Sequence, residues 1–100
     1  MITLNAMLRY KSGTSYSRHI RKFHNQLPGI IYGHSLINAP ILITMIHDKI
    51  FHLQKKNEFY SENLLLCINQ KEYIVRVKEI QRHAFKLRIL HIDFIHINIS

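Results

Sequence analysis

The sequence predicts a mostly β fold, a small and mainly antiparallel barrel that carries short helices at its rim. Two observations support this prediction. Several short apolar segments alternate with a period of two and are separated by turn-forming residues, whereas two segments repeat their apolar residues every three or four positions. In addition, 47% of the 100 residues are hydrophobic, which suffices for one core and leaves little room for a second. We therefore expect a single domain spanning residues 1–100.

The N-terminal part predicts a strand and then a basic helix. Residues 2–6 alternate apolar and polar side chains, as expected of a half-buried strand, and residues 11–15 are expected to form a loop. From Tyr16 to Leu27 the apolar residues instead recur every three or four positions, which is typical of an amphipathic helix. Its other face is basic, and we expect Pro28–Gly29 to end it.

The middle of the chain predicts two strands followed by a second helix. Ile30–Gly33 is an apolar run that enters a turn, and Ile41–Ile46 is a second apolar run after Pro40. His47–Leu53 has helical spacing, with Asp48 near its N-terminus, where the helix dipole favours a negative charge. We expect both strands in the core and the helix at the rim.

The C-terminal part predicts a hairpin and a last strand. Leu64–Ile68 and Tyr73–Ile80 are joined by a short polar segment, and the second arm alternates apolar with basic residues. From Leu90 the apolar residues alternate again, but their phase slips at Phe94–Ile95, where we expect a bulge or the end of the strand. Residues 97–100 then form a short C-terminal extension.

Charge is distributed unevenly along the chain. Fourteen Lys and Arg against six Asp and Glu give a net charge of +8, and residues 1–47 contain five basic side chains but no acid. Such a surface attracts polyanions, because neutralising phosphates releases their counterions. Nucleic acid is therefore the favoured partner, with an anionic membrane or an acidic protein as alternatives. The basic helix is either part of that contact or an ordinary solvated face.

A second basic segment spans Arg76–Arg88. It interleaves five Lys and Arg with Gln81, His83 and Phe85. Planar polar groups, cations and an aromatic ring in one segment suit contacts with the phosphates and 2′-hydroxyls of RNA. The alternative is an ordinary exposed strand edge. We favour RNA contact for the segment. His83 and His91 are expected to act as hydrogen-bonding groups rather than as metal ligands.

The sequence gives little support to a metal site or to catalysis. Among eight histidines, His47 and His52 are five positions apart, whereas two ligands on one helix face need a spacing of about three or four. No Gly-rich phosphate loop and no other common catalytic motif is present. His91 and Asp93 could form an acid/base pair, but a buttressing or RNA-contacting pair is favoured. We therefore expect no metal, no cofactor and no enzymatic activity.

The single cysteine, Cys67, lies in an apolar run and is expected to pack as a small hydrophobic residue. One cysteine excludes a disulfide within the chain. The start lacks a charged segment followed by a long apolar one, and no stretch approaches about 18 apolar residues. We therefore expect a soluble cytoplasmic protein that is monomeric when free, with neither a membrane nor a small-molecule substrate as partner.

Five short motifs occur in order along the chain: Gly29–Gly33, His47–Lys49, Glu58–Glu62, Gln81–His83 and His91–Phe94. From Met1 to about His96, the chain resembles the short form of the bacterial large-subunit ribosomal protein twenty-five family, the 5S ribosomal RNA-binding proteins related to the general stress protein Ctc. The resemblance implies a six-stranded β-barrel with two or three short helices. It also implies binding to the loop E region of 5S ribosomal RNA, in the central protuberance of the large subunit.

The resemblance also implies a set of RNA contact residues: Arg9, Arg18, Arg21, Tyr32, Gln81, Arg82, His91 and Asp93. The arginines are expected on phosphates, and the four other residues on sugar hydroxyls and base edges. On composition alone, Tyr32 would instead belong to the core.

The chain departs from the family pattern at several positions. Thr14 and His19 stand where a Lys and an Arg are expected, so two phosphate contacts are weakened, and Lys78 replaces a usual Gln. Ala84 and Leu87 replace prolines, which loosens the unfolded chain by about 0.4 to 1 kcal/mol each. These changes affect stability more than function.

We therefore predict a structural RNA-binding protein of the large ribosomal subunit, with neighbouring ribosomal components as further partners. One alternative is a general basic RNA chaperone or stress factor without a single docking site, whose affinity follows charge alone. The other is a nuclease that depends on His91 and Asp93.

Overall fold

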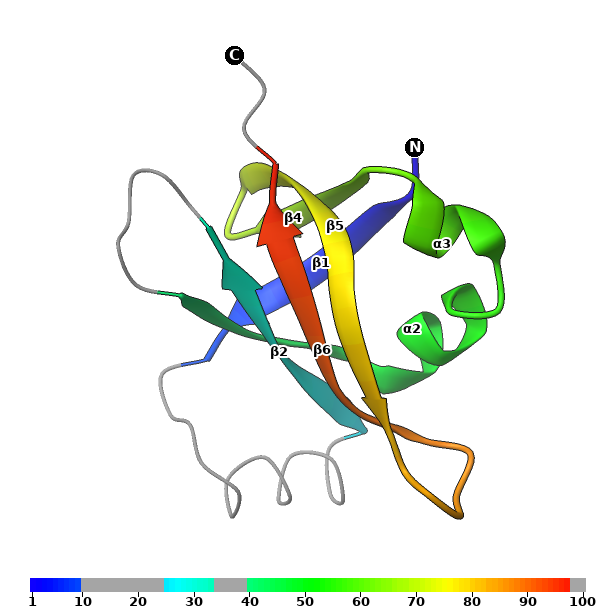
Figure 1. Ribbon diagram of the computed structural model, residues 1–100. Helices are drawn as coiled ribbons and strands as arrows, with labels where there is room; N and C mark the ends of the chain where they lie inside the picture. Colours follow the sequence, from blue (N-terminus) through cyan, green and yellow to red (C-terminus); the bar gives the residue numbers. More distant parts are fainter. Residues whose placement is uncertain (10–24, 34–39, 98–100) are drawn as a thin grey trace.

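The computed structural model of the chain describes residues 1–9, 25–33 and 40–97. Within these ranges six strands close into a barrel in the order β1-β3-β2-β6-β5-β4 (Figure 1). The strands are β1 (Thr3–Leu8), β2 (Gln26–Tyr32), β3 (Ile41–Ile46), β4 (Leu64–Ile68), β5 (Lys71–Arg82) and β6 (Ile89–His96). Two short helices, α2 (His47–Leu53) and α3 (Asn57–Ser61), connect β3 to β4. The predicted six-stranded barrel is confirmed.

The sheet is mixed rather than purely antiparallel. β1 pairs with β4 and β2 pairs with β6 in parallel, while the other four pairings are antiparallel. Parallel neighbours need a long crossover, and both parallel pairs join strands that are far apart in the sequence. Closure leaves no free sheet edge in the barrel.

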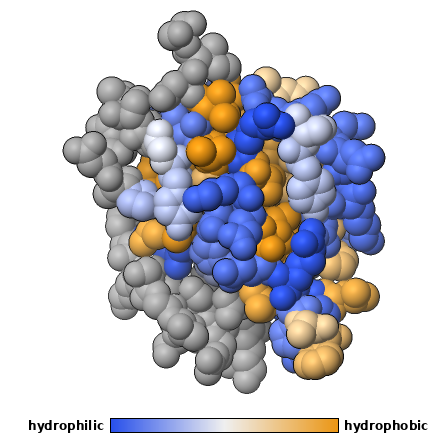
Figure 2. Space-filling view, in the orientation of Figure 1, coloured by the Kyte–Doolittle hydropathy of each residue, from blue (hydrophilic) through white to orange (hydrophobic). Residues whose placement is uncertain are grey.

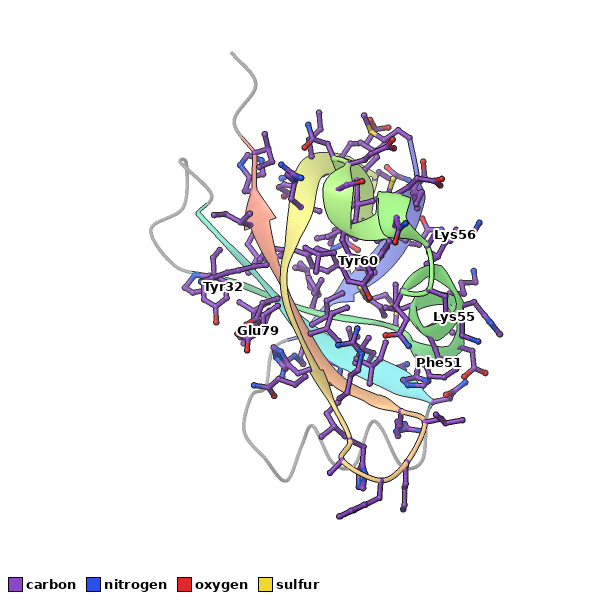
Figure 3. All side chains as sticks on the ribbon, turned by 45° about the vertical axis from the view of Figure 1, so that its right-hand side comes forward. Tyr32, Phe51, Lys55, Lys56, Tyr60 and Glu79 are labelled. Carbon is purple, nitrogen blue, oxygen red and sulfur yellow. The ribbon has the colours of Figure 1, made fainter. Side chains whose placement is uncertain are left out.

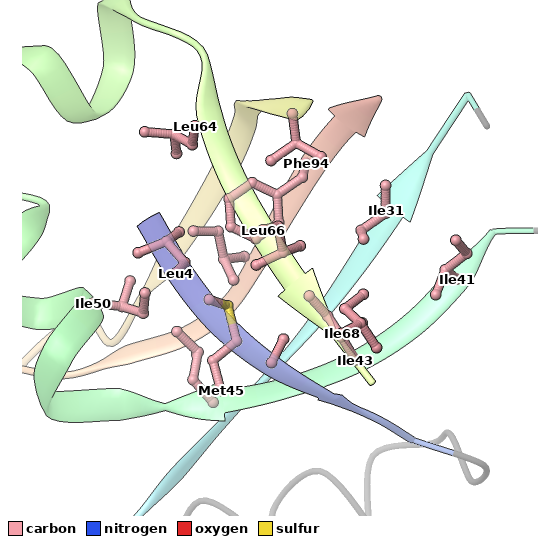
Figure 4. Close-up of a cluster of buried hydrophobic side chains, with 14 of the residues drawn as sticks. Leu4, Ile31, Ile41, Ile43, Met45, Ile50, Leu64, Leu66, Ile68 and Phe94 are labelled. Carbon is pink, nitrogen blue, oxygen red and sulfur yellow. The ribbon is translucent and has the colours of Figure 1, made fainter. Parts of the chain in front are cut away.

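The barrel interior is filled by the inward side chains of all six strands (Figure 4). Leu4 and Ala6 are buried on β1, as the alternation of residues 2–6 predicts. Ile50 of α2 and Phe59 of α3 are also buried, so the helices cover one end of this core. The helix at His47–Leu53 was predicted, whereas α3, with five residues, is too short to show a helical repeat. No helix within the described ranges is long and apolar enough to cross a membrane.

The prediction that Pro28–Gly29 ends a helix is wrong, because both residues lie inside β2. Pro28 has no backbone N–H to donate. It is tolerated because it pairs on one side only, with Thr44 of β3, while the ladder to β6 begins at the next residue. Gly29 is required by close strand packing, since a Cβ at this position would lie 2.9 Å from the Ile92 carbonyl oxygen. Of the predicted helix before β2, residues 16–24 lie outside the described residues.

The irregularity predicted near Phe94–Ile95 exists, but it lies in the neighbouring strand. β6 continues beyond these residues, whereas β5 shifts its register between Val77 and Glu79. Lys78 is therefore the extra residue of a β-bulge opposite this part of β6. The change of phase in the apolar pattern of β6 has another cause. Ile95 is apolar, yet its side chain lies on the outer face, where it is 41% exposed.

Candidate functional site

The outer face of β2, β6 and β5 brings together four of the predicted contact residues. β6 lies between the other two strands, so its outward residues have neighbours on both sides. His91 pairs with Gln81 of β5, while Asp93 pairs with Ile30 of β2. The four residues are Tyr32, Gln81, His91 and Asp93, and together with Lys78 they are called the polar face. Figure 2 shows hydrophilic side chains gathered over β5 and β6 on this side of the barrel.

Asp93 and His91 form a close pair at the centre of the polar face. Asp93 Oδ1 lies 3.0 Å from His91 Nδ1, and the two side chains are only 17% and 21% exposed. Within the part of the chain that the structure describes, this oxygen is buried and has no hydrogen-bond partner, so its close contact with the His91 ring does not replace the hydrogen bonds that a carboxylate makes with water. A buried acceptor of this kind is costly in the free protein and gains from a donor supplied by a partner.

Tyr32 lies on the outer face, half-buried, and not in the core as composition alone predicts. The Nζ atom of Lys78 lies 4.6 Å from the centre of the Tyr32 ring, a cation–π geometry that the bulge at Lys78 makes possible. Glu79, which pairs with Asp93, adds a second acid to this surface. Acids and a cation thus stand side by side, so the polar face offers donors and acceptors in addition to positive charge.

Arg82 lies apart from the polar face, although it directly follows Gln81. Its Nε donates to Gln54 Oε1 at 3.0 Å, and its Nη2 donates to the Tyr60 hydroxyl at 2.9 Å. These partners belong to the helical end, by which we mean α2, Gln54 and α3. Figure 3 shows Tyr60 on one side of β5 and Tyr32 and Glu79 on the other. The phosphate contact of Arg82 stays a prediction.

Arg9 is 6% exposed and holds three strands together. Its Nε donates to the Ile43 carbonyl oxygen at 3.2 Å, and its Nη2 donates to the Gly29 carbonyl oxygen at 3.1 Å. Its backbone N–H donates to the Leu42 carbonyl oxygen at 2.9 Å. This structural role is not implied by the resemblance, and a phosphate contact by Arg9 stays a prediction. The two other arginines of the predicted set, Arg18 and Arg21, lie outside the described residues.

His47 and Asp48 position the start of β6, a role that the sequence did not reveal. His47 Nε2 accepts the backbone N–H of Ile89 at 2.9 Å, so this ring is neutral and carries its proton on Nδ1, 3.3 Å from Asp48 Oδ1. Asn25 Nδ2 donates to Asp48 Oδ2 at 3.1 Å. The hydrogen bonds from His47 and Asn25 hold the pKa of Asp48 below its ordinary value of 3.8.

His83 has the hydrogen-bonding role that was predicted for it. Its Nδ1 accepts the backbone N–H groups of Phe85 and Lys86, each at 3.1 Å, which orders the turn between β5 and β6. Among the residues that the structure describes, no three His, Cys, Asp or Glu side chains are grouped as metal ligands would be. Cys67 is half-buried on β4.

A closed barrel with hydrogen-bonding side chains on three adjacent strands, in a chain of net charge +8, has the features of a protein that binds a polyanion through a fixed surface. The sequence places it more narrowly. The Ribosomal L25p family matches residues 4–94, and the chain belongs to this family.

Several relatives are similar over nearly their full length. The large ribosomal subunit protein bL25 of Buchnera aphidicola from Schizaphis graminum is 50% identical over 99 residues, which cover 99% of this chain and 100% of the relative. The protein of the same name from the Acyrthosiphon pisum symbiont (strain Tuc7) is 48% identical over 97 residues, with 97% and 99% covered. That of Klebsiella pneumoniae is 45% identical over 95 residues, with 95% and 98% covered. The predicted family, and with it a ribosomal protein rather than an enzyme, is confirmed.

Proposed function

We propose that this chain is a structural constituent of the large ribosomal subunit that binds 5S ribosomal RNA at its loop E region, in the central protuberance. The observation that carries the proposal is the polar face, and above all the buried oxygen of Asp93, which lacks a hydrogen-bond partner in the described part of the chain. The relatives named as large-subunit protein bL25 support the ribosomal part of the proposal.

The shape of the polar face suits an RNA minor groove. A-form RNA hides its major groove and displays 2′-hydroxyls and base edges in a wide, shallow minor groove. The outer surface of three barrel strands is broad, and it can lie in such a groove without insertion of a helix. Non-Watson–Crick pairs in loop E change which donors and acceptors that groove displays, so a fixed set of side chains can distinguish it from a regular helix.

Each residue of the polar face has a defined chemical part in this proposal. Asp93 accepts a hydrogen bond from a 2′-hydroxyl or a base amino group, because among the described residues no group donates a hydrogen bond to its Oδ1. Gln81 and His91 form a cross-strand pair that offers donors and acceptors to base edges or sugars. Tyr32 presents its hydroxyl to a sugar, and Lys78 beside it supplies a cation for a phosphate. Arg18 and Arg21 are assigned to phosphates.

A gel-shift experiment with two RNAs tests this function. Purified protein is titrated against intact 5S RNA and against 5S RNA in which loop E is converted to regular base pairs, at one fixed salt concentration. We expect tighter binding to the intact RNA, with a difference that persists as salt is raised, since it comes from short-range polar contacts. Equal binding to both RNAs would contradict the proposal and favour a general RNA chaperone, whose affinity depends on charge alone.

A further inference from the structure

The turn between β5 and β6 exposes two large apolar side chains. Phe85 is 94% exposed and Leu87 is 89% exposed, although residues of these types are usually found in the interior. The turn projects beyond the barrel (Figure 1), and apolar atoms stand beside hydrophilic ones at this corner of the molecule (Figure 2). Neither side chain serves the core, so the fold itself does not explain a ring at position 85.

The turn holds these side chains in a defined position. The ring atom Nδ1 of His83 accepts two backbone N–H groups of the turn. The backbone N–H of His83 donates to the Arg88 carbonyl oxygen at 2.9 Å. The Arg88 N–H donates to the Lys86 carbonyl oxygen at 2.8 Å. A turn ordered by four hydrogen bonds loses little conformational freedom when it binds a partner. The Phe85 ring meets His83 at a centroid distance of 6.4 Å and an angle of 64°, and is otherwise open to solvent.

The charge around the turn favours an anionic partner. From residue 80 to residue 92 the chain contains Arg82, Lys86 and Arg88 but no Asp or Glu. RNA combines phosphates, which these cations attract, with base faces on which an aromatic ring can stack. An apolar pocket on another protein would accommodate the ring but would not account for the cations.

The turn is also continuous with the polar face. Gln81 and His91, which pair across β5 and β6, are the residues of that face closest to the turn along both strands. An RNA segment lying over this pair and continuing past the ends of the two strands reaches Phe85. We propose that Phe85 stacks on an unpaired base of the RNA bound at the polar face, with Lys86 and Arg88 on neighbouring phosphates; this inference rests on the proposed function.

The absence of tryptophan from the sequence makes the stacking directly measurable. The variant Phe85→Trp carries a single tryptophan, whose fluorescence is quenched when its ring stacks on a base. We expect quenching by 5S RNA that saturates at the same protein–RNA ratio as the gel shift. Phe85→Leu and Phe85→Ala should bind intact 5S RNA roughly 5-fold to 100-fold more weakly, since one base–aromatic stack is lost.

Leu87→Ala is the matched control, because it removes an equally exposed apolar side chain without removing a ring. It should bind within about twofold of wild type, and all variants should keep the wild-type melting temperature, since neither side chain packs in the core.

A full gel shift without quenching, together with wild-type affinity of Phe85→Ala, overturns the stacking and leaves the proposed function intact. If the wild-type protein fails to distinguish the two 5S RNAs, both the stacking inference and the proposed function are overturned. The inference is also overturned if the tryptophan is shielded from a soluble fluorescence quencher in whole large subunits but not in the protein–5S RNA complex. That result points to a protein partner.

Discussion

Gln81 and Arg82 are neighbours in β5, yet their side chains lie on opposite sides of that strand. Gln81 pairs with His91 on the polar face, whereas Arg82 donates to Gln54 and Tyr60 at the helical end. On the helical side, the arginine finds its acceptors within the chain. On the polar face, Asp93 Oδ1 is buried and has no hydrogen-bond partner among the residues that the structure describes.

The difference separates residues that hold the fold from residues that, under the proposed function, bind RNA. A buried polar group bonded within the chain stabilises the native state, while an unsatisfied one reduces stability until a partner supplies the missing bond. Arg9 is the clearest residue of the first kind, because its guanidinium bonds two backbone carbonyls inside the protein. Asp93 is the clearest of the second. The two kinds should therefore respond in opposite ways to substitution.

The largest effect is expected for Arg9→Ala. This change leaves the carbonyl oxygens of Ile43 and Gly29 without their donor and opens a cavity, so the free energy of unfolding should fall by about 3 kcal/mol. Urea denaturation measures it. The control is Arg76→Ala, which removes an exposed arginine that donates to the Ser61 carbonyl oxygen and should cost less than about 1 kcal/mol. Equal losses in the two variants would show that burial of Arg9 contributes nothing.

Asp93→Ala should act on binding and spare the fold. Discrimination between intact and altered 5S RNA should fall by about 1 to 3 kcal/mol, because one well-formed polar contact disappears. The free energy of unfolding should change little, because removal of a buried oxygen without a hydrogen bond offsets the loss of its contact with His91. Gel shifts and urea denaturation on one preparation measure both quantities.

Glu79→Ala is the control for Asp93→Ala, since Glu79 pairs with Asp93 across the strands and is exposed. Removing this acid should strengthen binding to both RNAs equally, by reducing repulsion of phosphates. A large loss of stability in Asp93→Ala, with unchanged discrimination, would place Asp93 among the residues that hold the fold.

Side-chain alternation predicted the strands because it is a local property. Leu4 and Ala6 of β1 and Val75 of β5 are buried, while Arg76 is exposed, as their spacing requires. The wrong prediction for Pro28–Gly29 has a non-local cause. Gly29 is required by the close approach of β6, and Pro28 is tolerated because the β6 ladder begins only after it. The position of β6, which comes from the far end of the chain, cannot be inferred from the neighbourhood of a Pro-Gly pair.

The arrangement of the candidate site residues could be predicted only in part. The resemblance named Tyr32, Gln81, His91 and Asp93, and the barrel brings these four together on one face. It could not place Arg9 in the interior, because that depends on carbonyl groups of two other strands. The extra residue at Lys78 is likewise visible only in the pairing of β5 with β6.

The pair Gln81→Ala and Arg82→Ala tests the comparison at adjacent positions. Gln81→Ala should reduce discrimination between the two RNAs by about 1 kcal/mol or more and leave stability unchanged, because its side chain is exposed on the polar face. Arg82→Ala should lower stability by about 1 kcal/mol, through the lost bonds to Gln54 and Tyr60. Tyr60→Phe isolates one of those bonds and should reproduce part of the loss. Similar profiles for both alanine variants would contradict the assignment of opposite sides.

The smallest effect concerns pH and the start of α2. Hydrogen bonds from His47 and Asn25 hold the pKa of Asp48 below its ordinary value of 3.8, so the charged carboxylate is favoured in the folded chain. Its stabilising contribution is therefore present above that ordinary pKa and is lost as the pH falls through the lower folded value. Asp48→Asn should be slightly less stable than wild type near neutral pH, and the two should converge in acid.

Urea denaturation at a series of pH values, from neutral down to about 2, measures this convergence. Asn25→Ala keeps the carboxylate but removes one of its donors, so it should show part of the same pH dependence. The effect should be small because Asp48 is exposed and its hydrogen bonds compete with water. A stability difference between Asp48→Asn and wild type that stays constant down to the lowest pH would show that the substitution acts through helix geometry, since only a change in charge can disappear when the wild-type carboxylate is protonated.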